Sequence, residues 1–295
     1  MSESPPLVLC FGEILWDFLP DALYPGGAPF NVAYHLRQQG LDARPVSAVG
    51  RDVLGDELMR RLRAWKVDTR LIATHATAPT GYVQAAISER GDATYTIVRD
   101  VAWDEIPFGA ELARAAVGAR ALVFGSLAQR SALNQRSLDE LFAAVPAAAL
   151  RVFDVNLRPP HDDLALVRRL ARRATVIKLN AGEAARLARD DTEAPGREES
   201  DARSIAEMTG CALVCITAGG RGAGLLRASQ WHWENGHPIT VADTIGAGDA
   251  FLASLVADLV SGHRTDEEFL AHACRLGEWV ATQRGATPAY APASR

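Results

Sequence analysis

The sequence lacks several features that mark particular classes of protein. No uninterrupted apolar run approaches the roughly 20 residues that a membrane-spanning helix needs, so we expect no membrane association. The first residues carry no basic region ahead of their short apolar stretch, which argues against a secretory signal peptide. With only four cysteines in 295 residues, a disulfide framework is excluded, and the expected compartment is the cytoplasm.

Lysine and clusters of positive charge are also scarce. Lys66 and Lys178 are the only lysines, and the 36 acidic residues outnumber the 31 basic ones, which leaves a net charge of −5. A weakly acidic chain without blocks of Lys and Arg has no electrostatic surface suited to nucleic acid or to an anionic membrane. We therefore expect neither as a partner.

The chain does contain a regular alternation of short apolar runs with helical patterns. Continuous apolar runs are typical of strands that are covered on both faces, which predicts a mostly parallel sheet between layers of helices. The predicted strands are residues 7–12, 43–50, 120–126, 150–156, 174–180 and 211–217, and the clearest helices are 31–40, 54–65 and 250–260. The polar, charged segment 189–203 is expected to be a solvated loop that precedes a helix.

One stretch departs from this alternation of apolar runs and helical patterns. Residues 80–98 form two alternating runs around the turn 89–92, which predicts a hairpin, and residues 14–20 also alternate. They are either two extra edge strands or a small β subdomain rooted at residues 13–21 and 79–102 that stands off the main sheet as a lid. We favour the lid.

The most informative segment precedes the apolar helix 250–260. Gly246, Ala247 and Gly248 are small, so they leave consecutive backbone N–H groups uncovered where the helix dipole adds positive charge. Asp249 would face the same point. Amides that hold an anion beside a carboxylate suit phosphoryl transfer, because the acid can accept the proton of the attacking hydroxyl. An ordinary helix cap is the alternative.

Several further segments are less specific when taken alone. Gly26 and Gly27 precede Asn31 in a turn that either binds a polyol or simply leads into a helix. Asn180 and Glu183 follow a strand at a spacing that fits either a site or a capping arrangement. Two further groups follow predicted strands: the glycine-rich residues 217–224, and the polar residues Asp154, Asn156 and Arg158.

Taken in order, these segments resemble the ribokinase-like (PfkB) sugar kinase family. The matching motifs run along nearly the whole chain: FGEILWD, GGAPFNVAYHL, VSAVGRDVLGDEL, FGSLAQRS, FDVNLR, KLNAGE, TAGGRGA, DTIGAGDAF and RGATPAY. The resemblance implies a ribokinase-like three-layer α/β/α sandwich, in which residues 1–295 form one kinase domain with an inserted β-sheet lid. It also implies that this lid closes over the substrates, and that two copies form a homodimer through it.

The resemblance assigns roles to individual residues. It implies that Asp249 is the catalytic base and that the amides of Gly246, Ala247 and Gly248 form an anion hole for the γ-phosphate of ATP. By position in the family's motifs, the resemblance implies that the sugar is bound by Asp17, Gly26, Gly27 and Asn31, and that Arg158 contacts substrate and phosphate. It implies nucleotide binding by Asn180, Thr217, Gly219 and Gly222, and water-mediated Mg²⁺ binding by Asn180 and Glu183. A monovalent cation such as K⁺ would be bound by Asp243, the Ile245 carbonyl and the Gly285 region.

The acceptor sugar is less closely defined. Ribokinases usually carry Gly-Lys-Gly after the glycine pair, whereas this chain has Ala28, Pro29 and Phe30, and its motifs look more like those of bacterial fructokinases. Fructose is therefore the expected acceptor. Arg99, near the predicted lid, could contact sugar hydroxyls or equally an acidic sugar such as 2-keto-3-deoxygluconate. The motifs also leave open ribose, tagatose phosphate or a nucleoside as the acceptor, and a non-catalytic sensor of sugar or nucleotide as the function.

Overall fold

A nine-stranded sheet forms the centre of the molecule. The computed structural model describes residues 4–18, 22–87, 93–262 and 264–290. The strands from β11 to β5 are parallel to their neighbours, and β12 and β13 are added antiparallel at one edge. In spatial order the strands are β13 (Gln230–Asn235), β12 (Gly222–Arg227), β11 (Leu213–Thr217), β10 (Val176–Asn180), β9 (Leu150–Asp154), β8 (Ala119–Gly125), β1 (Leu7–Phe11), β4 (Asp42–Gly50) and β5 (Ile72–His75).

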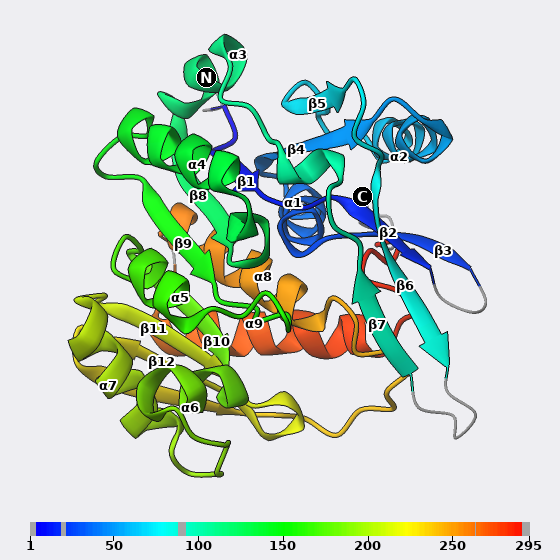
Figure 1. Ribbon diagram of the computed structural model, residues 1–295. Helices are drawn as coiled ribbons and strands as arrows, with labels where there is room; N and C mark the ends of the chain where they lie inside the picture. The colour runs from blue at the N-terminus through cyan, green and yellow to red at the C-terminus, as the bar shows by residue number, and fades with distance from the viewer. Residues whose placement is uncertain (1–3, 19–21, 88–92, 263, 291–295) are drawn as a thin grey trace.

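Helices cover both faces of this sheet (Figure 1). One face packs against α1 (Ala28–Gln38), α8 (Ala247–Ser261) and α9 (Asp266–Ala281). The other packs against α3 (Ala110–Ala116), α4 (Ala132–Ala144), α5 (Leu164–Ala171), α6 (Ala181–Arg189) and α7 (Glu198–Thr209).

The strand residues supply both cores in alternation. In β1, Val8 and Cys10 point into the core under α1 and α8, and Leu9 and Phe11 point into the opposite one. Successive side chains of a strand face opposite sides, so a strand between two helical layers is mostly apolar on both faces. This is why the continuous apolar runs predicted the three-layer architecture correctly.

A second, smaller sheet stands beside the main one (Figure 1). Its spatial order is β3 (Leu23–Gly26), β2 (Leu15–Phe18), β6 (Gly81–Ile87) and β7 (Ala93–Ile97), with β2 and β6 parallel and the remaining pairs antiparallel. We call it the small sheet. Helix α2 (Val53–Ala64) packs where the small sheet meets β4 and β5, because Leu58 and Leu62 share a core with Ile14 and Trp16.

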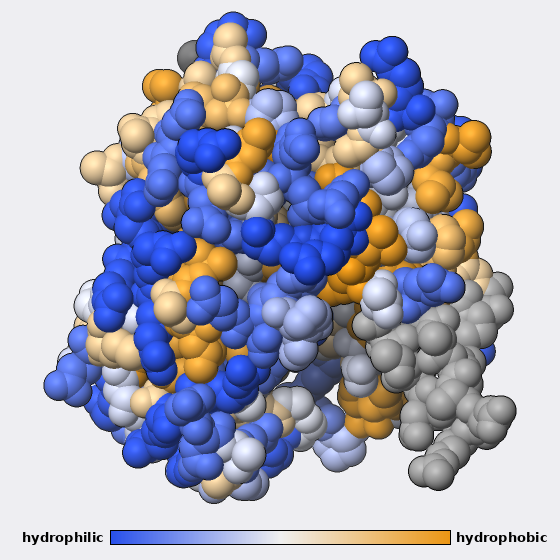
Figure 2. Space-filling model, viewed as in Figure 1, coloured by the Kyte–Doolittle hydropathy of each residue, from blue (hydrophilic) through white to orange (hydrophobic). Residues whose placement is uncertain are grey.

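Figure 2 shows the same face of the molecule as Figure 1: hydrophilic residues cover most of it, and hydrophobic ones gather beside the small sheet. Three short 3₁₀ segments, η1 (Ala102–Asp104), η2 (Leu127–Arg130) and η3 (Gly219–Arg221), complete the secondary structure of the described residues. Within those ranges, no helix combines the length and the apolar character needed to cross a membrane.

Several boundaries differ from the sequence-based expectations. The small sheet has a strand, β3, that was not predicted, because Tyr24-Pro25-Gly26 is typical of a turn; pairing with β2 holds it extended. The predicted loop 189–203 is wrong in part, since α7 begins inside it at Glu198, where acidic residues in the first turn suit the helix dipole. The glycine-rich segment 217–224 runs into β12. The predicted turn 89–92 and residues 19–21 lie outside the described residues.

The carboxyl ends of the parallel strands meet at one edge of the main sheet. Open α/β sheets bind their ligands at this edge. The segments that follow β1, β9, β10 and β11 here carry most of the polar residues singled out from the sequence, and helices α1 and α8 pack against each other beside them.

Candidate active site

The turn before α8, which we call the amide cradle, places the backbone N–H groups of residues 246–248 at the start of the helix, and Ala247 N donates to the Thr244 carbonyl at 3.3 Å. Gly246 caps the helix with a φ of 79°, a left-handed conformation that suits glycine, and Ala286 packs directly against it. The Asp243 carboxylate accepts hydrogen bonds from Ile245 N at 2.9 Å and from Gly285 N at 3.1 Å. Asp243 therefore fixes the turn and joins it to the segment at Gly285, as the sequence-based grouping of these residues requires.

Asp249 lies in the first turn of α8 and meets α1. Asn31 Nδ2 donates a hydrogen bond to Asp249 Oδ2 at 2.8 Å. Asn31 is only 4 % exposed, and its Oδ1 has no partner among the described residues. One contact thus joins two predicted motifs whose residues lie 218 positions apart in the chain.

The turn before α1 brings the remaining candidate sugar-binding groups of the N-terminal region to the same place. The Asp17 carboxylate of β2 lies against Gly26, and the Glu13 carbonyl lies against Gly27, which has a φ of 109°. A Cβ atom at either glycine would collide with these oxygens. The glycine pair is therefore required for a close approach between this turn and the segment that follows β1.

Glu13 was missed by the sequence analysis. Its side chain is buried, Oε1 accepts a hydrogen bond from Ala28 N at 3.3 Å, and Oε2 has no partner among the described residues. Burial raises the pKa of Glu13 to about 7, with a smaller contribution from Asp249. An acid placed directly after a buried strand was the available signal, and it is the same signal that singled out Asp154.

The neighbouring carboxyl groups of the site are perturbed in the same direction. Burial, with the adjacent Asp154, raises the pKa of Asp249 to about 6, against the opposing influence of Lys178, Asn31 and Arg158. Burial also raises the pKa of Asp17 to about 6. The positive charge of the exposed Arg158 partly opposes the rise in the pKa of Glu13, Asp17 and Asp249. This arginine therefore lies near all three carboxyl groups.

A buried ion pair lies behind the amide cradle, and its lysine was not predicted. Lys178 Nζ in β10 is 3.1 Å from Asp154 Oδ1 in β9, and a Cβ built on Gly248 would lie 3.1 Å from the same Nζ. Burial lowers the pKa of Lys178, but the carboxylates of Asp154, Glu183 and Asp249 outweigh it and raise the pKa overall. A charged lysine inside an apolar strand, in a chain with two lysines, was the signal.

Asn180 and Glu183 form the capping arrangement that the sequence left open. Asn180 Oδ1 accepts from Glu183 N at 2.8 Å, and Glu183 Oε2 accepts from Asn180 N at 2.9 Å. Glu183 Oε1 also accepts from Leu157 N at 2.8 Å, which fixes the loop just before Arg158. Among the described residues, no group of three or more His, Cys, Asp or Glu side chains is arranged to hold a metal ion.

The remaining predicted residues lie farther along the sheet edge or beside the small sheet. Thr217 ends β11 opposite Asn180, with its hydroxyl 3.4 Å from the Leu179 carbonyl. Gly219 lies exposed in η3, and Gly222 begins β12 where Glu234 of β13 approaches closely. Arg99 is exposed just after β7 and has no hydrogen-bond or ion-pair partner among the described residues. Burial chiefly lowers the pKa of His161, and the charges of Arg130 and Arg99 add to this.

This arrangement can hold an anion beside a base. The amides of the α8 turn and Lys178 favour negative charge, and Asp249 offers a carboxylate that is fixed by Asn31.

The chain is similar to known proteins along nearly its whole length. The sequence model of the pfkB family of carbohydrate kinases matches residues 21–293. A fructokinase of Salmonella typhimurium is 29 % identical over 300 residues, which cover 96 % of this chain and 95 % of the relative.

Solved structures share the fold. A fructokinase of Xylella fastidiosa with bound ATP has a TM-score of 0.82 at 23 % identity and covers 95 % of this chain and 94 % of its own. A double-mutant fructokinase of Vibrio cholerae O395 with fructose, ADP and a potassium ion also has a TM-score of 0.82 at 23 % identity, covering 97 % and 96 %. Because the family match spans nearly the whole sequence, the chain belongs to the pfkB family of carbohydrate kinases.

Proposed function

We propose that this carbohydrate kinase transfers the γ-phosphoryl group of ATP to a hydroxyl group of fructose. The observation that carries the proposal is the hydrogen bond between Asn31 and Asp249, which joins the polyol-binding turn to the base beside the amide cradle. The Salmonella typhimurium relative is named a fructokinase, and the Vibrio cholerae structure contains fructose and ADP.

In the proposed reaction, the sugar hydroxyl oxygen attacks the γ-phosphorus, the bond to the β–γ bridging oxygen breaks, and ADP leaves. Asp249 accepts the hydroxyl proton. With its pKa raised to about 6, Asp249 is ionised at neutral pH yet is a stronger base than an ordinary aspartate. The amides of Gly246, Ala247 and Gly248, together with Lys178, stabilise the charge on the transferred group.

Further residues hold the substrates in the proposed account. Asp17, Gly26, Gly27 and Asn31 bind the sugar, and Arg158 lies between the sugar and the transferred phosphoryl group. Thr217, Gly219, Gly222 and Asn180 border the nucleotide. The small sheet acts as the lid, which excludes water so that ATP is not hydrolysed. Two copies of the chain pair through their lids.

The site also fits cations. Mg²⁺ usually keeps several waters and is held by one or two carboxylates and by phosphates, so in this account Glu183 and the exposed Asn180 would hold it through water. There it would neutralise phosphate charge. Asp243, the Ile245 carbonyl and the Gly285 region would hold K⁺, since Asp243 already joins the two segments.

A carboxylated sugar such as 2-keto-3-deoxygluconate is the second candidate acceptor. Arg99 and Arg158 are both exposed, and neither has a hydrogen-bond or ion-pair partner for its side chain among the described residues. An acidic acceptor needs a second positively charged side chain, such as Arg99, besides Arg158, which faces the phosphate. The Arg99→Ala variant is therefore expected to abolish phosphorylation of an acidic sugar but only to weaken that of fructose.

The direct test measures ADP release with ATP and Mg²⁺ across fructose, ribose, tagatose phosphate, adenosine and 2-keto-3-deoxygluconate. Strong turnover on fructose is the expected result. Strong turnover on a different acceptor alone would refute the fructose assignment. Binding of a sugar without any turnover would instead favour a non-catalytic sensor.

A further inference from the structure

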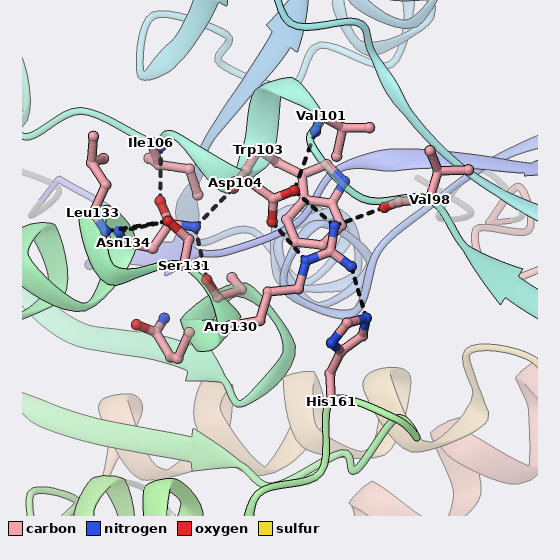
Figure 3. Close-up of polar contacts among 12 residues, drawn as sticks. Val98, Val101, Trp103, Asp104, Ile106, Arg130, Ser131, Leu133, Asn134 and His161 are labelled. Atoms are coloured by element: carbon pink, nitrogen blue, oxygen red, sulfur yellow. Dashed lines mark hydrogen bonds and ion pairs between the residues drawn. The ribbon is translucent and has the colours of Figure 1, made fainter.

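Arg130 lies at the junction between the small sheet and the main body of the molecule (Figure 3). Its side chain is only 8 % exposed. Nε and Nη2 donate to the two carboxylate oxygens of Asp104 at 2.7 and 2.8 Å. The guanidinium carbon also lies 4.0 Å from the centre of the Trp103 ring. Both partners belong to η1, the first structured segment after the small sheet.

The same guanidinium holds the end of the small sheet. Nη2 donates to the Val98 carbonyl at 2.7 Å, and Val98 is the first residue after β7. Trp103 packs against Gly81, the first residue of β6, so closely that a Cβ there would collide with the indole nitrogen. The start of β6 therefore packs against Trp103, and the end of β7 is hydrogen-bonded to Arg130.

A third contact leads from Arg130 toward the sugar site. Nη1 lies 3.3 Å from His161 Nε2, and because a guanidinium group has only donors, the imidazole accepts with this nitrogen. His161 N in turn donates to the Arg158 carbonyl at 2.7 Å. Figure 3 shows His161 reaching Arg130 from the side opposite Asp104 and Trp103. Arg130 thus connects the small sheet to the loop that carries Arg158.

The charge of Arg130 is paired with a carboxylate of the protein itself. The two-point contact with Asp104 neutralises it, in contrast to Arg99 and Arg158, whose side chains have no such partner among the described residues. Only arginine offers donors in a flat fork that can reach a carboxylate, a carbonyl and an imidazole at once. These observations favour a role in positioning neighbouring groups over direct contact with a substrate.

We propose that Arg130 is a positioning residue that sets the small sheet against the Arg158 loop. This inference rests on the proposed function, in which the small sheet closes over the acceptor. Asp17 and Arg99 lie on or beside the small sheet, and Arg158 lies on the loop, so Arg130 fixes the two halves of the acceptor site relative to each other.

The kinetic test compares Arg130→Lys with the wild type and with Arg173→Gln. Lysine keeps the charge beside Asp104 but cannot reach Val98 and His161 at the same time. Arg173 is the control away from the site: at the surface, with a side chain 44 % exposed, it pairs with Asp139 at 2.9 Å and lies 4.6 Å from the centre of the Phe142 ring.

For Arg130→Lys we expect kcat/KM for the acceptor to fall about 10- to 100-fold. The KM for ATP should stay near the wild-type value, and more ATP should be hydrolysed per sugar phosphorylated. The melting temperature should fall only modestly, because the Val98 carbonyl and His161 lose this donor. Arg173→Gln should change none of these. Wild-type acceptor kinetics in Arg130→Lys, or an equal rise in both KM values together with a lower melting temperature, would overturn the proposal.

Hydrogen exchange of the full-length protein without substrates tests the same connection independently of activity. In Arg130→Gln, the amides near residues 97–101 and those near 157–161 should exchange faster together, whereas Arg173→Gln should leave both unchanged. Faster exchange in one segment alone, or in neither, would contradict the connection. If the wild type phosphorylated no acceptor, the proposed function would fail while this measurement still decided whether Arg130 joins the two segments.

Discussion

At the scale of single residues, the site is a group of carboxyl groups that the fold makes harder to ionise. Glu13, Asp17 and Asp249 all have raised pKa values, chiefly because they are buried, and Arg158 partly offsets this in each case. Such groups carry a proton near neutral pH more readily than surface carboxylates do. Their titration should therefore be visible both in the rate and in the stability of the protein.

The rate should fall on the acidic side. Asp249 must be ionised to accept a proton, and its pKa is about 6, so kcat/KM for the acceptor should be level above pH 7 and fall about tenfold per unit below pH 6. A rate profile from pH 5 to pH 9 with saturating ATP measures this. A profile that stays level down to pH 5 would mean that the base has an ordinary aspartate pKa.

Ionisation of Glu13 should make the fold less stable as the pH rises, whereas the rate falls as the pH drops. The pKa of Glu13 is about 7 in the folded protein against an ordinary 4.5, so the folded state holds the proton more tightly. The stability gained from that proton is complete below pH 4.5 and is lost as the pH rises through 7. Glu13→Gln should therefore melt higher than the wild type at pH 8, by about 2–4 °C for each kcal/mol gained, and the gap should close toward pH 5.

Glu57→Gln is the control of opposite sign. Arg60 and Arg61 lower the pKa of Glu57 to about 2, so its stabilising contribution is present above pH 4.5 and is lost in acid. The Glu57 side chain is 32 % exposed and lies at the surface, where an ion pair contributes little, so this variant should melt at or slightly below the wild-type temperature at pH 8. A Glu13→Gln variant that melted lower than the wild type at pH 8 would show that its buried carboxylate stabilises the fold.

At the scale of elements, the site depends on how strands β9 and β10 meet the start of α8. Lys178 of β10 is held by Asp154 of β9 and lies behind Gly248. Lys178→Met keeps much of the apolar stem and removes the charge, so kcat should fall by about 10²–10³-fold, the range found when one stabilising group is removed from an anion hole. The double variant Asp154→Asn, Lys178→Met, which removes both charges of this ion pair, separates lost catalysis from lost folding. A kcat near the wild-type value in both variants would exclude Lys178 from the anion site.

The helices and strands also show which features could be predicted from the sequence and which could not. Six strands of the main sheet were predicted because continuous apolar runs are a local signal, whereas β5, β12 and β13 at its two edges were not predicted. The α8 turn was predicted because small residues before an apolar helix are a local signal as well. Strand β3 was missed because its extended form depends on pairing with β2. Glu13 and Lys178 were missed because their importance comes from burial and from partners far away in the chain, such as Asp154, 24 residues before Lys178.

At the scale of the whole molecule, three layers and a small sheet bring residues from both ends of the chain to one place. The central claim is that Asp249, held by Asn31 at the start of α8, removes the proton of the acceptor hydroxyl. The pfkB family match identifies the chain as a carbohydrate kinase, and the role of Asp249 is a proposal that a single substitution tests.

The most direct test measures phosphorylation and acceptor binding in the same Asp249→Asn protein. Asparagine keeps an oxygen that can accept from Asn31, so the fold and sugar binding by calorimetry should be largely retained. The account predicts that turnover falls by at least about 10²–10⁴-fold while the dissociation constant of fructose changes little. Turnover close to that of the wild type would contradict the assignment of Asp249 as the base.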